Sequence, residues 1–115
     1  MSVARFTDRS DAVLVLIDMQ ESLASAMERR DAVVRTSVLL ARVARLLDVP
    51  VIVTRQYPRG LGDTVSALRE ATAGTGPIDK VTFSCLAEPA FAERLRALGR
   101  RQIVILDPDR LSDQT

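Results

Sequence analysis

A run of six apolar residues at positions 12–17 ends directly at Asp18. Apolar residues in succession, without polar alternation, are typical of a strand buried on both faces of a parallel sheet. Because such sheets bind their ligands at the carboxyl ends of the strands, this position predicts that Asp18 is an active-site carboxylate. The alternative is that Asp18 only caps the helix expected to follow it, at residues 20–27.

A second apolar, β-branched run at residues 51–54 follows a long predicted helix at residues 31–47. Asp31 is expected to cap this helix, whose apolar positions follow i, i+3, i+4, i+7 spacing and should cover a face of the sheet. These positions are Thr36, Leu39, Leu40, Val43, Leu46 and Leu47. The strand, helix, strand order predicts a right-handed crossover between parallel strands.

The rest of the chain continues the alternation of strands and helices. The expected elements are a helix from Asp63 to about residue 72, a short strand at 81–83, a helix from Pro89 to Gly99, a strand at 102–106 and a polar tail at 107–115. The order predicts one α/β domain over residues 1–115, built on a parallel sheet.

Composition excludes several classes of function. With 16 basic and 15 acidic side chains, the net charge of +1 gives no field to recruit nucleic acid or a membrane surface. The absence of histidine excludes a Ser-His-Asp triad and a Cys-His pair, and no metal site or cofactor is expected. The lone Cys85 and the lack of a signal peptide or spanning segment lead us to expect a cytoplasmic protein.

Three segments together resemble a known family. They are Ile-Asp-Met-Gln at 17–20, Val-Thr-Arg-Gln-Tyr-Pro-Arg-Gly-Leu-Gly-Asp-Thr-Val at 53–65, and Lys-Val-Thr-Phe-Ser at 80–84. In this order the sequence resembles the isochorismatase-like cysteine hydrolase superfamily, and within it the isochorismatase domain-containing proteins, over residues 10–106. The long loop at 56–62 makes the resemblance more specific than Asp-x-Gln alone.

The resemblance implies a three-layer α/β/α, Rossmann-like fold with a parallel sheet, here without the C-terminal strands and helices of the family fold. It also implies a hydrolase that acts on a small amide, carbonyl-type or vinyl-ether substrate through Asp, Lys and Cys. Asp18 matches the family acid, which takes the proton of the cysteine, and Lys80 matches the lysine, which stabilises negative charge and orients the acid. A free thiol has a pKa of about 8.5 and needs such neighbours to become nucleophilic. Gln20 and Tyr57 would shape the substrate pocket, and homo-oligomers are common in the family.

The sequence departs from the family after the strand at 102–106. The family has a Gly-x-Glu turn there, followed by the nucleophilic cysteine and its oxyanion hole, whereas this chain reads Asp-Pro-Asp-Arg at 107–110. Cys85 lies elsewhere and is expected to be a core or pocket residue. Activity as an enzyme is therefore uncertain, and we expect it to be weak or lost.

The alternatives follow from that departure. One is a catalytically inactive α/β protein that binds a ligand or oligomerises, and a weaker one is a flavodoxin-like or receiver-type domain, against which the lack of a glycine-rich phosphate loop counts. Without the last family strands, the strand at 102–106 would be an uncovered apolar edge. We therefore expect either a truncated product, for example with an altered reading frame after Leu106, or a piece completed by self-association.

Overall fold

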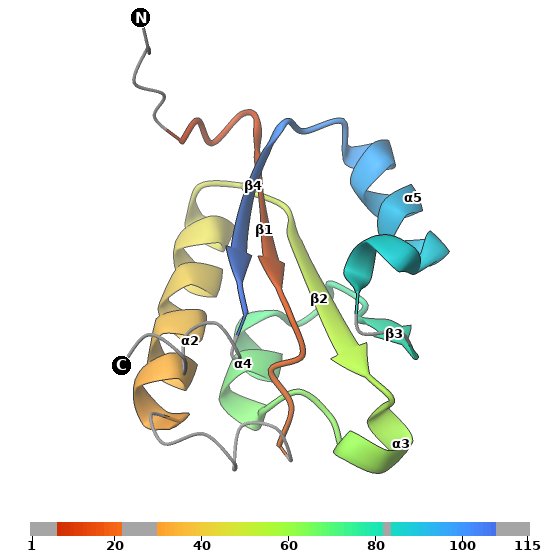
Figure 1. Cartoon of the computed structure of the whole chain (residues 1–115). Helices are drawn as coiled ribbons and strands as arrows, with labels where there is room; N and C mark the ends of the chain where they lie inside the picture. Colours follow the sequence, from red (N-terminus) through yellow and green to blue (C-terminus); the bar gives the residue numbers. More distant parts are fainter. Residues whose placement is uncertain (1–6, 22–29, 82–83, 108–115) are drawn as a thin grey trace, which may run out of the picture.

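A four-stranded parallel sheet forms the centre of the computed structural model, which describes residues 7–21, 30–81 and 84–107. Its strands are β1 (Ala12–Leu16), β2 (Val51–Gln56), β3 (Ile78–Lys80) and β4 (Gln102–Leu106). Their order is β3-β2-β1-β4, and each neighbouring pair is parallel (Figure 1). All carboxyl ends therefore meet at one edge of the sheet.

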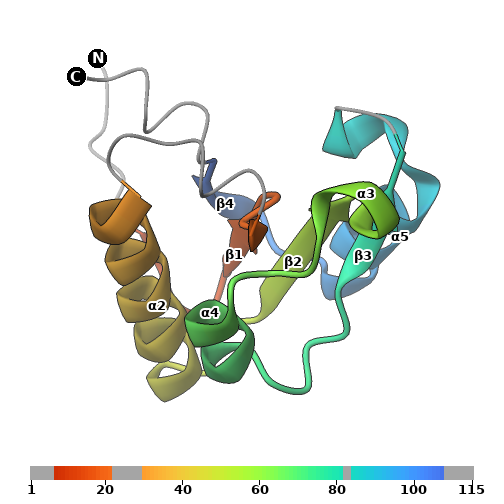
Figure 2. The same ribbon diagram turned by 90° about the horizontal axis from the view of Figure 1, so that it is seen from below.

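Helices cover both faces of this sheet. Figure 2 shows α2 (Arg30–Leu46) and α4 (Ser66–Ala71) on one side and α5 (Pro89–Leu98) on the other. The short helix α3 (Pro58–Leu61) lies beyond the carboxyl end of β2 (Figure 1). The arrangement confirms the predicted three-layer α/β/α fold with a parallel sheet.

Two apolar cores, one on each face, explain the composition of β1. All five residues of β1 are buried, because alternate side chains point to opposite faces and both faces are covered. Leu14 and Leu16 belong to the core on the side of α2, whereas Val13 and Val15 pack with Phe91 of α5. The unbroken apolar run is thus the signature of a central strand.

The predictions for β1, β4 and α5 are confirmed. The second strand is also present, but β2 continues beyond the predicted residues 51–54 to Gln56, which was expected in the loop. Pro89 occupies the first turn of α5, where its missing N–H has no helical partner to lose. Gly99 ends this helix with φ 63°, a left-handed conformation that glycine adopts without strain. Strand β4 spans the predicted residues.

The predicted buried stripe of α2 is wrong. Leu39, Val43, Leu46 and Leu47 are exposed, and of the predicted positions Leu40 is partly buried against the core. The buried face consists of Val33, Ser37, Ala41 and Ala44. Small side chains bring the helix close to the sheet, so the larger leucines lie beside the contact instead of within it.

Three predicted element boundaries also need correction. Asp31 lies within the first turn of α2 instead of preceding it. Helix α4 starts only at Ser66, because the Asp63 carboxylate binds two arginines and the N–H of Thr64 instead of capping the helix. The third strand, placed at 81–83 from the sequence, is Ile78–Lys80, so Lys80 ends it. Most of the predicted helix at 20–27 and of the tail at 107–115 lies outside the described residues.

Strand β4 is an open edge of the sheet as the structure describes it. Within the described ranges it pairs with β1 alone, and its Ile103 and Ile105 side chains are 44% and 57% exposed. The expected apolar edge is therefore present. In these same ranges we find no helix with the length and apolar character needed to cross a bilayer.

Candidate active site

The carboxyl edge of the sheet brings Asp18 and Lys80 together, although 62 positions separate them in the chain. Asp18 follows β1, and Lys80 is the last residue of β3. The Lys80 Nζ lies 2.9 Å from Asp18 Oδ2, which forms an ion pair. The prediction that these two residues share one site is consistent with this contact.

Asp18 is held by strand β2 on its other side. The Thr54 hydroxyl donates to Asp18 Oδ1 at 2.9 Å, and the Asp18 N–H donates to the Thr54 main-chain oxygen at 3.2 Å. The backbone at Asp18 has φ 52°, a left-handed conformation that few residues other than glycine adopt. Both carboxylate oxygens thus accept bonds from Thr54 and Lys80, so the alternative of a simple helix cap finds no support in these contacts.

Lys80 is the most deeply buried charge of the site. Its side chain is 0% exposed, whereas that of Asp18 is 14% exposed. A second hydrogen bond, of 2.7 Å, runs from Lys80 Nζ to the side-chain oxygen of Gln56. Burying an ammonium group is costly unless it is paired and hydrogen-bonded. Lys80 is therefore not an ordinary solvated lysine.

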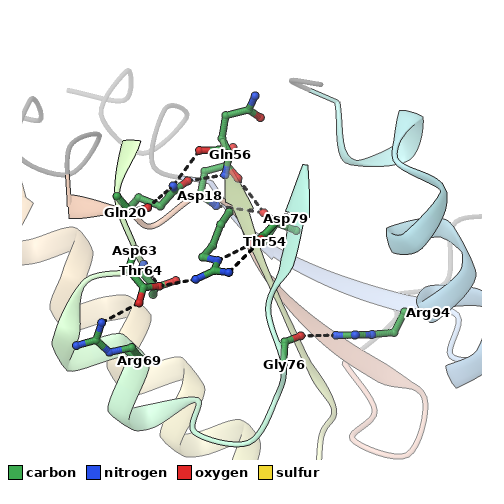
Figure 3. A network of polar contacts seen from close by, with 12 residues as sticks. Asp18, Gln20, Thr54, Gln56, Asp63, Thr64, Arg69, Gly76, Asp79 and Arg94 are labelled. Carbon is green, nitrogen blue, oxygen red and sulfur yellow. Dashed lines mark hydrogen bonds and ion pairs between the residues drawn. The ribbon is translucent and has the colours of Figure 1, made fainter. Parts of the chain in front are cut away.

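Gln20 makes its side-chain hydrogen bonds to main-chain atoms beside the site. Its side chain donates to the main-chain oxygens of Gln56 at 2.9 Å and Gly62 at 2.7 Å, and accepts from the Gln56 N–H at 2.6 Å (Figure 3). It is fully buried. Gln20 therefore ties the end of β2 to the loop after α3.

Tyr57 lies at the surface of the protein, and Cys85 lies against the core on the side of α5. The Tyr57 side chain is half exposed and lies over Gly60, where an added Cβ would be 2.7 Å from the tyrosine ring. Cys85 packs against the core on the side of α5. Burial raises the pKa of the Cys85 thiol, while the positive charge of Lys80 and a hydrogen bond with Thr54 act in the opposite direction.

Thr54 and Gln56 are parts of the site that the sequence analysis did not identify. They are alternate residues of β2 and share a face with Ile52, which belongs to the core on the side of α5. Along this face of β2 the sequence changes from an apolar residue to two polar ones. This change could have indicated that the carboxyl end of the strand lines a polar site.

This arrangement can perform acid–base chemistry. A carboxylate with a fixed orientation and a partly open edge can accept a proton, and the neighbouring ammonium can stabilise negative charge. A metal site is not evident, because residues 7–21, 30–81 and 84–107 contain no group of three or more His, Cys, Asp or Glu side chains that could hold an ion.

The fold and the site together define a Rossmann-like α/β protein with an acid–lysine pair at the carboxyl edge of its sheet. The chain belongs to the isochorismatase domain family, whose model matches residues 12–106. The family resemblance stated from the sequence is therefore confirmed.

Known relatives agree with this assignment. The chain is 39% identical over 95 residues to human isochorismatase domain-containing protein 2, covering 83% of this chain and 44% of the relative. The MAR1 ribonuclease of Caenorhabditis elegans is 36% identical with a TM-score of 0.77, covering 89% of this chain and 52% of that one. The YcaC gene product of Escherichia coli, an octameric hydrolase of unknown specificity, has a TM-score of 0.85 at 22% identity, covering 91% and 53%. The chain thus spans about half the length of these relatives.

Proposed function

We propose that the chain carries the acid–lysine part of a hydrolase site for a small amide, carbonyl-type or vinyl-ether substrate. The observation that carries this proposal is the 2.9 Å contact between a fully buried lysine and a partly open carboxylate. Asp18 acts as the general base, and Lys80 orients it and stabilises negative charge on the substrate. Gln20, Tyr57 and Cys85 shape the pocket, and no cofactor takes part.

The step assigned to Asp18 is a proton transfer. Thr54 and Lys80 each occupy one carboxylate oxygen, so the acid is fixed, and its exposed fraction of 14% leaves an edge that an incoming group can reach. A proton from a thiol or a water would pass to this carboxylate as the nucleophile attacks. The buried ammonium would face the charge that develops on the substrate.

The nucleophile limits what this chain can do alone. The family cysteine has no counterpart at the matching position in the sequence, and Cys85 is the only thiol. Burial raises the pKa of Cys85, which keeps it in the less reactive thiol form. We therefore propose that thiol-dependent hydrolysis by this chain is weak or lost.

The experiment compares hydrolysis of small amides, esters and a vinyl ether by the wild type, Asp18→Asn and Asp31→Asn. Asp31 is a matched control because its side chain is 91% exposed and its ion pair is with Arg30, not with Lys80. We expect Asp18→Asn to reduce any measurable rate about 100-fold, the usual contribution of a general base, and Asp31→Asn to leave it unchanged. Equal rates for the wild type and Asp18→Asn would contradict the proposal.

Two other functions remain as competitors. One is an inactive protein that binds a small ligand or oligomerises, which would be favoured if no substrate is turned over and ligands still shift the NMR signals of Asp18 and Lys80. The other is RNA cleavage, which only the similarity to the Caenorhabditis elegans ribonuclease suggests. A short RNA belongs in the substrate panel for this reason, although the net charge of +1 gives RNA little general attraction.

We further propose that the chain forms homo-oligomers as one domain in the cytoplasm. Support for self-association comes from the exposed isoleucines of β4 and from the octameric state of the Escherichia coli relative. Support for the location comes from the single cysteine, since intracellular thiols stay reduced.

A further inference from the structure

Lys80 is the last residue of β3, the shortest strand of the sheet. Strand β3 has three residues and, among the described parts of the chain, pairs with β2 alone. In its register, Arg55 lies opposite Asp79 and Gln56 lies opposite Lys80. A shift of one residue would turn Lys80 to the opposite face of the sheet. The contact with Asp18 therefore depends on the register of a short edge strand.

A two-bond ion pair lies at the register position next to Lys80, on the other face of the sheet. Arg55 Nε and Nη2 donate to the two carboxylate oxygens of Asp79 at 2.6 and 2.9 Å. The parallel bonds of a guanidinium and a carboxylate fix orientation as well as distance. The Arg55 side chain is 21% exposed and the Asp79 side chain 49%, so water partly screens this pair and its main contribution is to fix orientation.

The same guanidinium also holds the loop that follows α3. Arg55 Nη1 donates to Asp63 Oδ1 at 2.9 Å, and Asp63 Oδ2 accepts a bond of 2.9 Å from Arg69 (Figure 3). The hydrogen bond from Arg55 is the main reason why the pKa of Asp63 is lowered. Arg55 therefore joins three segments, namely β2, β3 and this loop.

We infer that Arg55 is a positioning residue for Lys80. Its two bonds to Asp79 hold β3 in the register that places the Lys80 ammonium against Asp18 on the opposite face. Within the described residues, the side-chain hydrogen bonds of Arg55 are to Asp79 and Asp63 and not to Asp18 or Lys80, so its effect on the site is indirect. Any catalytic consequence rests on the function proposed above, whereas the geometric statement can be tested without enzyme activity.

The sequence offers a direct probe, because Lys80 is its only lysine. In protein without a tag, labelled with ¹⁵N-lysine, a single ammonium signal reports on this residue. Buried, hydrogen-bonded ammonium protons exchange slowly with water, so we expect the signal to be visible in the wild type. A wild-type ammonium that exchanges as fast as free lysine would overturn the inference.

The test compares Arg55→Lys and Asp79→Asn with Arg69→Lys. Arg55→Lys keeps the charge but loses the planar pair of donors, and a cavity of about 160 Å³ beside Arg55 lets the shorter side chain be hydrated. Arg69→Lys is the matched control, since the ion pair of Arg69 is with Asp63 in the loop after α3 and not with Asp79 of β3. We expect Arg55→Lys and Asp79→Asn to accelerate exchange of the Lys80 protons about tenfold, as for loss of a charge-assisted bond, and Arg69→Lys to change it less than twofold, as for an exposed pair.

Unchanged exchange in Arg55→Lys and Asp79→Asn would overturn the inference, as would an equal acceleration in Arg69→Lys, which would indicate general loosening. Circular dichroism confirms that each variant is folded, and Asp79→Asn retains Arg55 should Arg55→Lys fail to fold. Measurable hydrolysis that is equally fast in the wild type and in Asp18→Asn, together with a slowly exchanging wild-type ammonium, would refute the proposed function and leave this inference standing. Where turnover is measurable, Arg55→Lys should lower kcat more than it raises KM, because Arg55 and Asp79 lie on the face of the sheet opposite Lys80.

Discussion

Asp18 combines an uncommon backbone conformation with a fully bonded carboxylate. Its φ of 52° places the side chain between Thr54 and Lys80, where an extended residue would continue the strand. Residues in sparsely populated conformations persist where the surrounding structure holds them, and they concentrate at functional sites. The contacts that hold the Asp18 carboxylate therefore also stabilise its uncommon backbone conformation.

Cys85 supplies a pH-dependent prediction at the same scale. Burial raises the pKa of its thiol in the folded chain. The thiol should therefore react with iodoacetamide at pH 8 more slowly in the folded chain than in urea, where its pKa is near 8.5. A folded chain that reacts as fast as the unfolded one would show that the thiol is not shielded.

The sign of the linked stability change follows from the same shift. Because the folded chain holds the thiol proton more tightly, the stabilising contribution is complete below the ordinary thiol pKa and is lost as pH rises through the folded value. Cys85→Ala should remove this dependence. The free energy of unfolding of the wild type should consequently fall relative to that of Cys85→Ala between pH 8 and pH 10.

Helix α2 shows what sequence patterns reveal about an element and what they leave out. The apolar periodicity correctly predicts the helix, but it also predicts that the face with the largest apolar residues is buried, which is wrong. The structure buries the face with Ser37, Ala41 and Ala44, because close approach to the sheet favours small side chains. A hydrophobic pattern reports apolar area, whereas the packing distance between layers decides which face fits.

Strands β1 and β4 were predictable because each is a continuous apolar run with a clear end. Asp18 and Lys80 were identified by their place in family motifs, whereas Thr54 and Gln56 were missed because their role depends on the pairing of β2 with its neighbours. Strand β3 was misplaced because three residues carry too little periodicity to define a strand.

Two substitutions in α2 test which of its faces is buried, one on the face that the structure buries and one on the face that the sequence predicted to be buried. Ala41→Leu should lower the free energy of unfolding by about 1–3 kcal/mol, because a buried small position cannot accept the added volume. Leu46→Ala should change it by less than about 0.5 kcal/mol, because Leu46 is 82% exposed. Urea denaturation measures both, and the reverse ranking would restore the face predicted from the sequence.

The whole molecule presents an apolar strand edge in a chain about half as long as its relatives. Strand β4 pairs with β1 on one side, and its other edge has no partner strand among the described residues; such an edge with exposed isoleucines is a favourable surface for association with another chain. Size-exclusion chromatography with light scattering should therefore give a mass above that of one chain. A compact monomer that unfolds cooperatively would contradict this expectation.

Variants locate the contact if association is found. Replacing Ile103 and Ile105 together by lysine should shift the chain toward the monomer, since charges on an edge strand oppose pairing. Leu86→Lys is the control, because Leu86 is also exposed but lies in the turn Cys85–Ala87 before α5. Equal loss of association in both variants would point to a nonspecific effect of charge.

The central claim for the whole molecule is that the fold couples Asp18 to Lys80, and a double-mutant cycle of Asp18→Asn and Lys80→Met tests it most directly. From urea denaturation we predict a coupling energy of about 2 kcal/mol, because removing one partner leaves the other charge buried without compensation. The exposed pair of Arg101 and Asp11 serves as the reference and should give less than about 1 kcal/mol. Additive effects of the two substitutions at Asp18 and Lys80, within about 0.3 kcal/mol, would contradict the account.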